Sequence, residues 1–205
     1  MNNFLKRILS AIILIPIALY FIVHGSYMLM FFTAICFFIA CYEWYMMTKK
    51  KTFKIYKFPF LFFSFYTFYE LQLIIVFFII LICVSTDIGG YIFGKIFKGP
   101  KLTKISPNKT YAGMIGGYFL SLICLTIISN FIDANTPIQF FLLTLIISTV
   151  SQIGDIIISY FKRLSKIKDT GKIIPGHGGL LDRIDGMIFA FPVVYLINLT
   201  EYLNV

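Results

Sequence analysis

Long apolar segments take up most of this chain, and they constrain its fold more than any motif does. Of the 205 residues, 59% are hydrophobic and only 13% are charged. This composition is typical of an integral membrane protein, and a helix satisfies its own backbone polar groups in lipid. At about 20 residues for each crossing, we predict an all-α, polytopic bundle of about seven transmembrane helices. We expect a single domain over residues 1–205.

The predicted spans follow the apolar segments between charged ones. They run approximately over residues 4–23, 27–47, 58–69, 71–94, 110–132, 137–164 and 184–203. The third is shorter than a usual crossing, but dividing the apolar stretch near Glu70 places all 18 Lys and Arg residues on one side of the membrane. That distribution is what the positive-inside rule predicts. We therefore expect a multi-pass protein of the plasma (inner) membrane with its charged loops facing the cytoplasm.

The net charge of +9 belongs to these loops, which would face anionic lipid headgroups, so we expect no nucleic-acid partner. The four cysteines lie inside apolar runs without metal-ligand spacing, and we expect no disulfides. We interpret the first apolar run, residues 4–23, as a retained helix because no convincing small-residue cleavage site follows it.

One long polar, charged and glycine-rich stretch interrupts the apolar pattern between Ser159 and Asp185. Together with Asp155 just upstream, it holds four of the nine acidic residues and six of the 18 basic residues. Carboxylates hold a hard divalent cation, Lys and Arg neutralise phosphate, and glycines let backbone approach a ligand closely. The stretch therefore favours a metal-plus-phosphate site over the alternative, a solvated loop between two membrane helices.

Helical spacing brings several of these groups together. Asp182 and Asp185 stand three residues apart at the expected start of the last span, so both carboxylates can reach one point. That point is a candidate metal site, with Asp155 as a third ligand. The alternative is that the two acids only complement the positive N-terminus of that helix. Asp155 also shares one stripe of the sixth span with three polar residues, Ser159, Lys162 and Arg163.

A second polar segment runs from Ser85 to Gly113. Asp87 lies within an apolar run, where a carboxylate needs a cation, a metal or a polar partner. Residues 106–110 then open a helix, whose free backbone N–H groups favour an anion. The small residues that follow, Gly113, Gly116 and Gly117, permit close contact with another helix.

Both polar segments resemble the phosphatidate cytidylyltransferase family, also called the CDP-diglyceride synthetases. The first stretch fills every fixed position of that family's hallmark pattern, with Ser159, Phe161, Lys162, Arg163, Lys168, Asp169, Gly171, Ile174, Pro175, His177, Gly178, Gly179, Leu180, Asp182, Arg183, Ile184 and Asp185. The second segment matches at Asp87, Gly94, Ser106, Pro107, Lys109, Thr110, Tyr111 and Gly113, whereas Ala112 stands where the family usually has glutamate. The resemblance is strong over residues 87–205, the family-like catalytic half, and weak over the N-terminal spans, residues 1–86. The chain is also shorter than the usual family member.

The resemblance implies an enzyme that transfers a cytidylyl group from CTP to phosphatidate, giving CDP-diacylglycerol and pyrophosphate in phospholipid biosynthesis. Two polyanions must meet in this reaction, so Mg²⁺, with or without a second cation, is the expected cofactor. The expected catalytic residues are Asp155, Ser159, Lys162, Arg163, Lys168, Asp169, His177, Asp182, Arg183 and Asp185, with His177 as a positioning group and a role in proton transfer left open. The expected substrate-binding residues are Asp87, Ser106, Lys109, Thr110, Gly178 and Gly179. The metal ligands would be Asp155, Asp182 and Asp185. CTP, phosphatidate and membrane lipids are the expected partners, and a homodimer is left open.

Two other classes of protein remain as alternatives. One is a small transporter with Asp87, Asp155 and Glu43 along an ion path. Glu43 lies near the cytoplasmic end of the second span, where a functional role and simple exposure at the interface are both open. The other is a different CTP-dependent lipid kinase or transferase, which as a kinase would release CDP. Charges gathered at one face of the membrane favour interfacial chemistry over transport.

Overall fold

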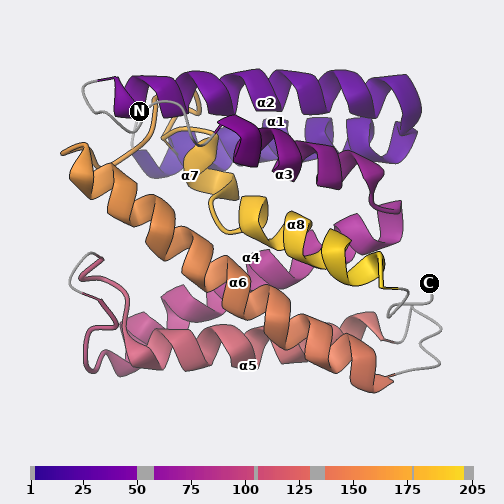
Figure 1. The fold of residues 1–205 in the computed structure, drawn as a ribbon. Helices are drawn as coiled ribbons and strands as arrows, with labels where there is room; N and C mark the ends of the chain where they lie inside the picture. Colours follow the sequence, from indigo (N-terminus) through magenta and orange to yellow (C-terminus); the bar gives the residue numbers. More distant parts are fainter. Residues whose placement is uncertain (1–2, 50–57, 104–105, 130–136, 177, 201–205) are drawn as a thin grey trace. The chain divides into compact units, whose positions relative to one another are not determined.

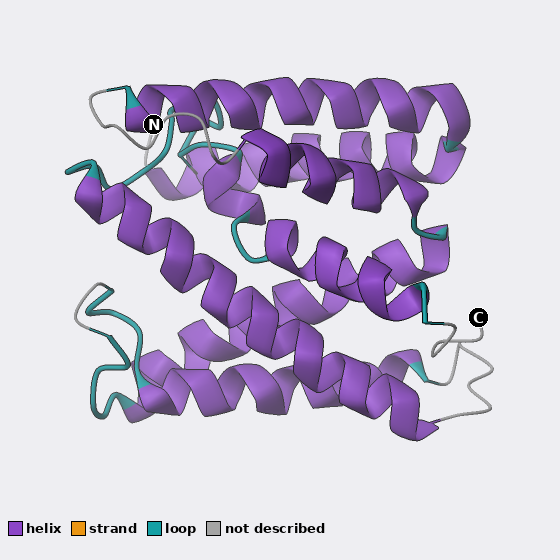
Figure 2. Cartoon of the chain, in the orientation of Figure 1, coloured by secondary structure: helices purple, strands orange, loops and turns teal. Residues whose placement is uncertain are grey.

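The computed structural model describes residues 3–49, 58–103, 106–129, 137–176 and 178–200. This part of the chain contains helices joined by turns and loops, with no β-strand and only two isolated bridges (Figures 1 and 2). The helices are α1 Asn3–His24, α2 Ser26–Thr48, α3 Phe58–Glu70, α4 Leu73–Phe97, α5 Tyr111–Ile128, α6 Pro137–Leu164, α7 Leu181–Ile184 and α8 Met187–Asn198. The predicted all-α fold is confirmed.

The first six helices agree with the predicted spans to within a few residues, including the short third one. The predicted seventh span, residues 184–203, corresponds to the shorter helix α8, and the short helix α7, which was not predicted, precedes it. The break between these two helices falls at Asp185 and Gly186, and a Cβ added to Gly186 would lie only 2.2 Å from Ser151 Oγ of α6. This close backbone approach to α6 accompanies the break. Asp182 therefore lies within α7, and Asp185 follows it.

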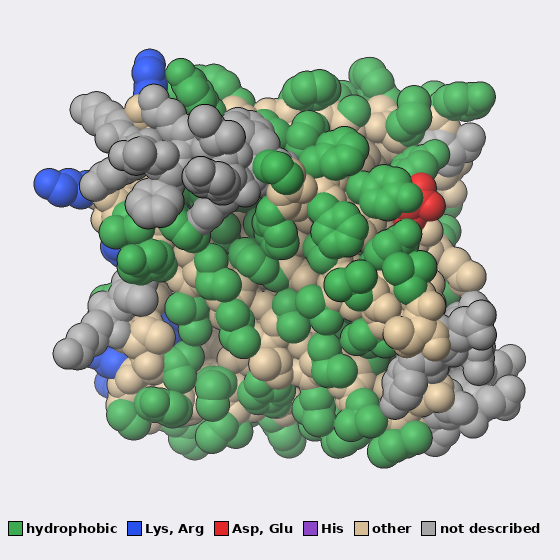
Figure 3. Space-filling view, viewed as in Figure 1, with side chains coloured by type: hydrophobic (Ala, Val, Ile, Leu, Met, Phe, Trp, Pro, Cys, Tyr) green, Lys and Arg blue, Asp and Glu red, His purple; other side chains and the backbone are tan. Residues whose placement is uncertain are grey.

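Four helical segments of the described chain are long and apolar enough to cross a membrane, namely Tyr27–Thr48, Leu73–Phe97, Tyr111–Ile128 and Ile138–Leu164. Two shorter apolar helices are Ile12–His24 and Met187–Asn198. Many large hydrophobic side chains are exposed on the helices, and they dominate the face drawn in Figure 3. Water would disfavour such a surface and lipid would accommodate it, so this is a polytopic membrane protein. The total of about seven crossings stays a prediction.

The chain divides into two compact units. Unit 1 consists of residues 1–73 and 161–185, and unit 2 consists of residues 74–160 and 186–205. The interpretation of the whole chain as one catalytic domain stays a prediction.

In unit 1, α2 packs against α1, α3 and α7 (Figure 1). Aromatic rings make up much of this packing. Phe21 of α1 stacks on Phe32 of α2 with ring centroids 5.4 Å apart. Phe37 of α2 meets the edge of Phe65 of α3 at 5.7 Å. Trp44, near the end of α2, meets Phe161 edge-on at 5.5 Å and so touches the point where the polar stretch begins.

In unit 2, small and hydroxylated residues bring α4, α5 and α6 together. A Cβ added to Gly89 of α4 would lie 2.3 Å from the carbonyl oxygen of Gly116 of α5. These two backbones are therefore in direct contact, as the glycines of the fifth span predict. Thr86 Oγ1 of α4 lies 3.0 Å from Ser148 Oγ of α6. Both side chains are buried, so the hydrogen bond satisfies polar groups that have no access to water.

Candidate functional site

The polar stretch, residues 159–185, begins within the last turns of α6 and continues as a loop after Leu164. Lys166 takes a left-handed conformation with φ of 58°, and its N–H donates to the carbonyl of Arg163 at 3.0 Å. The Ile167 N–H donates to the carbonyl of Lys162 at 3.0 Å. These bonds satisfy carbonyl groups that the end of a helix leaves open. The chain therefore turns sharply away from α6 directly after its basic residues.

A tight turn then folds the glycine-rich segment back on itself. Ile174 and Gly178 exchange two backbone hydrogen bonds of 2.9 and 3.2 Å. Gly178 has φ of 90°, a conformation that residues with a side chain rarely adopt. A Cβ there would also lie 2.9 Å from Asp182 Oδ2. Glycine is thus required at this position, because the turn has to pass close to the Asp182 carboxylate.

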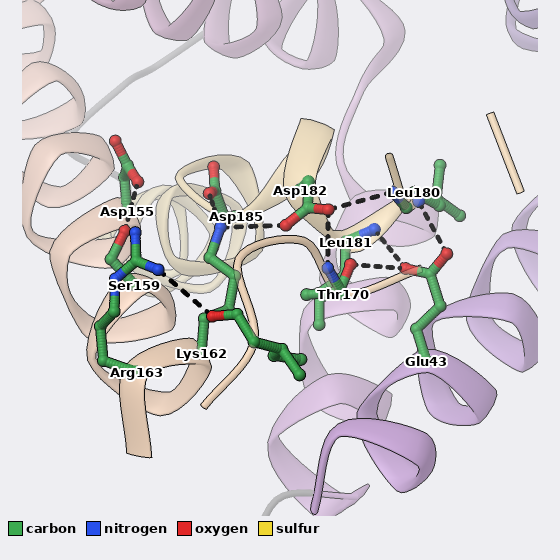
Figure 4. Close-up of polar contacts among 12 residues, drawn as sticks. Glu43, Asp155, Ser159, Lys162, Arg163, Thr170, Leu180, Leu181, Asp182 and Asp185 are labelled. Atoms are coloured by element: carbon green, nitrogen blue, oxygen red, sulfur yellow. Dashed lines mark hydrogen bonds and ion pairs between the residues drawn. The ribbon is translucent and has the colours of Figure 1, made fainter. Parts of the chain in front are cut away.

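Asp182 is the centre of a cluster formed by the polar stretch (Figure 4). Its Oδ2 accepts hydrogen bonds from the backbone N–H of Thr170 at 2.8 Å and of Gly179 at 3.0 Å. Its Oδ1 lies 2.9 Å from the Lys162 ammonium. The same ammonium lies 3.9 Å from Asp185 Oδ2. The two carboxylates therefore do reach one point, as their spacing predicts, and the group at that point is the Lys162 ammonium.

This cluster is largely removed from solvent. The side chains of Lys162, Asp182 and Asp185 are 12%, 6% and 13% exposed. Charges at this degree of burial interact more strongly than they would at the surface, because less water screens them. The cluster therefore forms a concentrated point of charge at the end of α6.

Sequence reasoning did not single out Glu43 as part of this arrangement. It lies on α2 with only 1% of its surface exposed. Its carboxylate accepts hydrogen bonds from Thr170 Oγ1 at 3.0 Å and from the backbone N–H groups of Leu180 and Leu181, both at 2.9 Å (Figure 4). An acidic residue at membrane depth was the only available signal, since its partners lie far along the chain.

Unit 2 contains a cavity of about 330 Å³. Lys109 and Asp155 line it and form an ion pair with each other. Asp155 also accepts a hydrogen bond of 3.3 Å from Ser159 Oγ. Three further predicted site residues belong to unit 2, and all three join Lys109 in the cavity lining: Asp87, Ser106 and Thr110.

A compact loop presents Lys109 to this cavity. The Leu102 N–H donates to the carbonyl of Lys109 at 2.7 Å, and the Tyr111 N–H donates to the carbonyl of Pro100 at 3.2 Å. Thr110 caps α5, because its side chain accepts from the N–H of Gly113 at 3.1 Å. The sequence prediction that residues 106–110 open a helix is confirmed.

A chain of hydrogen-bonded polar side chains connects residues of the cavity lining. Gln152, which lines the cavity, lies with its Nε2 3.3 Å from Ser148 Oγ. Ser148 in turn contacts Thr86, another lining residue. These hydrogen bonds link α6 to α4 within unit 2, and they hold the side chains of Gln152 and Thr86 in place.

The remaining predicted site residues have different surroundings. Arg163 donates to the carbonyl of Ile167 at 3.3 Å and is exposed. Three other charged residues of the stretch are also exposed: Lys168, Asp169 and Arg183. The N–H groups of Gly178 and Gly179 donate to the Ile174 carbonyl and to Asp182 and so shape the loop, and their part in binding a phosphate stays a prediction. His177 lies outside the described residues.

The residues of unit 1 fit one common way of binding Mg²⁺. Among the described residues, no three His, Cys, Asp or Glu side chains form a group that could hold a metal ion. Mg²⁺, however, is usually held by one or two carboxylates together with substrate phosphates and water. Asp182 and Asp185 suit that mode because an oxygen of each faces the same point. Asp155 belongs to unit 2, and its part in the three-carboxylate site stays a prediction.

Comparison with known proteins bears on the same segments. A sequence model described as the cytidylyltransferase family matches residues 52–200. The protein named phosphatidate cytidylyltransferase from Staphylococcus aureus (strain COL) is 46% identical over 119 residues, which cover 57% of this chain and 46% of that protein. Its namesake from Staphylococcus haemolyticus (strain JCSC1435) is 46% identical over 114 residues, 55% of this chain and 44% of the relative.

A third relative of that name, from Staphylococcus saprophyticus, is 43% identical over 122 residues, 58% of this chain and 47% of its own length. The matches thus span about half the length of these curated relatives. The family match covers well over half of this chain, and it includes the Lys162 cluster of unit 1 and the Lys109 loop of unit 2. The resemblance found in the sequence is confirmed, and the chain belongs to the cytidylyltransferase family.

Proposed function

We propose that this chain transfers a cytidylyl group from CTP to phosphatidate. A phosphate oxygen of phosphatidate attacks the α-phosphorus of CTP and forms a new P–O bond. The bond from that phosphorus to the oxygen bridging the α- and β-phosphates breaks, and its electron pair leaves with pyrophosphate. The products are CDP-diacylglycerol and pyrophosphate. The name of the relatives, phosphatidate cytidylyltransferase, supports this choice of substrates.

The observation that carries the proposal is the arrangement of Lys162 between Asp182 and Asp185. A buried ammonium facing two carboxylates provides both signs of charge at one point, which suits a phosphate together with its metal ion. Mg²⁺ held by Asp182 and Asp185 would offset the charge of the triphosphate. Lys162 would then donate to phosphate oxygens in place of the carboxylate it contacts now.

Other residues of the chain supply charge and shape. The exposed cations Arg163, Lys168 and Arg183 would attract the triphosphate or the phosphatidate headgroup. His177 would position substrate, because an attacking phosphate is already ionised near neutral pH and needs no strong base.

In unit 2, the cavity would take an anionic part of a substrate. Lys109 supplies the positive charge there, while Ser106 and Thr110 supply hydroxyl groups. Ser159 holds the Asp155 carboxylate that pairs with Lys109. We propose that these groups face the cytoplasm at the inner membrane, where CTP is available, and a homodimer is left open.

The test is product analysis with the purified protein in phosphatidate-containing detergent micelles. We expect pyrophosphate release from CTP, matched one-to-one by CDP-diacylglycerol, and loss of both products when EDTA replaces Mg²⁺. Asp182→Asn should abolish turnover while the protein stays in the membrane. Glu70→Gln, the same kind of change at the exposed end of α3, should retain activity.

Three results would contradict the proposal. Release of CDP with a phosphorylated lipid would identify a lipid kinase instead. Absence of any product, from folded protein that still binds CTP, would exclude the transferase activity. Full turnover by Asp182→Asn would remove Asp182 from the proposed metal site.

A further inference from the structure

Glu43 connects an N-terminal helix to the polar stretch that bears the Lys162 cluster. Its carboxylate accepts three hydrogen bonds, one from the side chain of Thr170 and two from the backbone at Leu180 and Leu181. These donors lie on both sides of the tight turn at residues 174–178, and they are separated from Glu43 by 127 to 138 residues along the chain. A single side chain of α2 therefore binds the loop on both sides of this turn.

The hydrogen bonds of Glu43 lead directly to Asp182. Thr170 donates its hydroxyl to Glu43 and its backbone N–H to Asp182 Oδ2 at 2.8 Å. Leu180 and Leu181 immediately precede Asp182 in the chain. Any shift of Thr170 or of these amides therefore moves the Asp182 carboxylate as well. Glu43 is thus linked to Asp182 through Thr170 and through the backbone that precedes Asp182.

The loop leaves space for this carboxylate by using glycine at two positions. A Cβ added to Gly171 would lie 2.7 Å from Glu43 Oε1. A Cβ added to Gly179 would lie 2.5 Å from Glu43 Oε2 and 2.2 Å from Thr170 Oγ1. These distances are shorter than side-chain atoms tolerate, so the loop wraps Glu43 without room for a larger residue.

We propose that Glu43 is a positioning residue for the transfer reaction, holding the loop so that Asp182 keeps its orientation toward Lys162. Glu43 lies before residues 52–200, the segment that matches the family. The N-terminal spans thereby contribute to the chemistry of the catalytic half. The effect on catalysis rests on the proposed function, whereas the effect on the loop does not.

The experiment compares Glu43→Gln and Thr170→Val with wild type in detergent, using two readouts. The first is the rate of trypsin cleavage after Lys172, the exposed lysine that lies between Thr170 and Leu180 in the chain. Where the loop recloses faster than trypsin cuts, this rate reports the population of the open loop. Removing hydrogen bonds to a buried charged group should increase cleavage by roughly 10- to 100-fold.

The second readout is steady-state kinetics with varied CTP. We expect kcat to fall by roughly 10- to 100-fold in Glu43→Gln, with a smaller change in KM for CTP. A misplaced Asp182 would stabilise the transition state less, whereas the cations that bind the substrate would stay in place. Thr170→Ser keeps the hydroxyl donor, so its trypsin cleavage rate and its kcat should stay at the wild-type values. Glu70→Gln is the matched control for the change of charge, and it should behave like wild type in both.

Wild-type cleavage rates in both Glu43→Gln and Thr170→Val would overturn the proposal. An unchanged kcat in a Glu43→Gln protein that trypsin cleaves faster than wild type would also overturn the proposal. If Glu43→Gln does not fold, as judged by its elution on gel filtration, Thr170→Val decides the question. If the wild-type protein releases no pyrophosphate, the proposed function fails, and the cleavage rates still test whether Glu43 holds the loop.

Discussion

The contact between α4 and α5 allows a substitution whose effect can be worked out from distances. Replacing Gly89 with Ala would place a methyl group 2.3 Å from the carbonyl oxygen of Gly116 and 2.9 Å from Leu120 Cβ. Ordinary contact begins at 3.4 Å, so the two helices would have to separate by about 1 Å. The clash is with backbone, which cannot rotate aside as a side chain can.

Overpacking of this kind costs about 1 to 3 kcal/mol. Gly90→Ala is the matched control, because its added methyl group would lie 3.7 Å from the nearest atom, the Gly113 carbonyl oxygen. Both variants gain the same helix propensity, about 1 kcal/mol, so their difference isolates the clash. For a chain of this size the difference corresponds to roughly 2 to 12 °C in unfolding midpoint.

The assay is thermal unfolding of the two variants in one detergent, followed by circular dichroism at a helical wavelength. We expect Gly89→Ala to melt below Gly90→Ala by the margin just given. Activity is not compared, because Gly90 lines the cavity. Equal midpoints, or a higher midpoint for Gly89→Ala, would refute the inference that the backbones of α4 and α5 touch at this point.

Two further predictions concern the two polar clusters. Lys109→Met should lower kcat/KM for CTP by roughly 10- to 100-fold, which is the effect of losing hydrogen bonds to a charged group. Lys95→Met, at the exposed end of α4, is the control and should leave kcat/KM unchanged. Equal kcat/KM values for the two variants would exclude Lys109 from substrate binding. Gly179→Ala should increase trypsin cleavage of the loop and lower kcat, because its methyl group would lie 2.2 Å from Thr170 Oγ1, and an unaltered loop in this variant would contradict the packing around Glu43.

The helices were largely predictable because polarity alone marks their ends. The sixth span was predicted over residues 137–164, and the structure gives the same bounds to α6. The charge distribution also located the short third helix, which ends at Glu70. In lipid, backbone hydrogen bonding leaves few alternatives to a helix, so an apolar run and its flanking charges are strong indicators.

The site was less predictable, because its contacts join distant parts of the chain. The sequence motif identified Lys162, Asp182 and Asp185, and helical spacing predicted that the two carboxylates meet. Neither the motif nor the spacing showed that the Lys162 ammonium lies between the two carboxylates. The role of Glu43 depends on hydrogen bonds to residues more than 120 positions away. The break before α8 likewise coincides with the close approach of Gly186 to Ser151, which no local pattern reveals.

The short third helix has a consequence for the lipid around unit 1. Its 13 residues extend about 20 Å, while the hydrocarbon core of a bilayer is about 30 Å thick. Its neighbour α2 has 23 residues and extends about 35 Å. As the predicted third crossing, α3 would create a hydrophobic mismatch with the lipid beside its exposed Phe62 and Tyr66, which α2 would not. If α3 crosses the bilayer as predicted, local thinning of the membrane would relieve this mismatch, and we expect acyl chains of different length to stabilise the protein to different degrees.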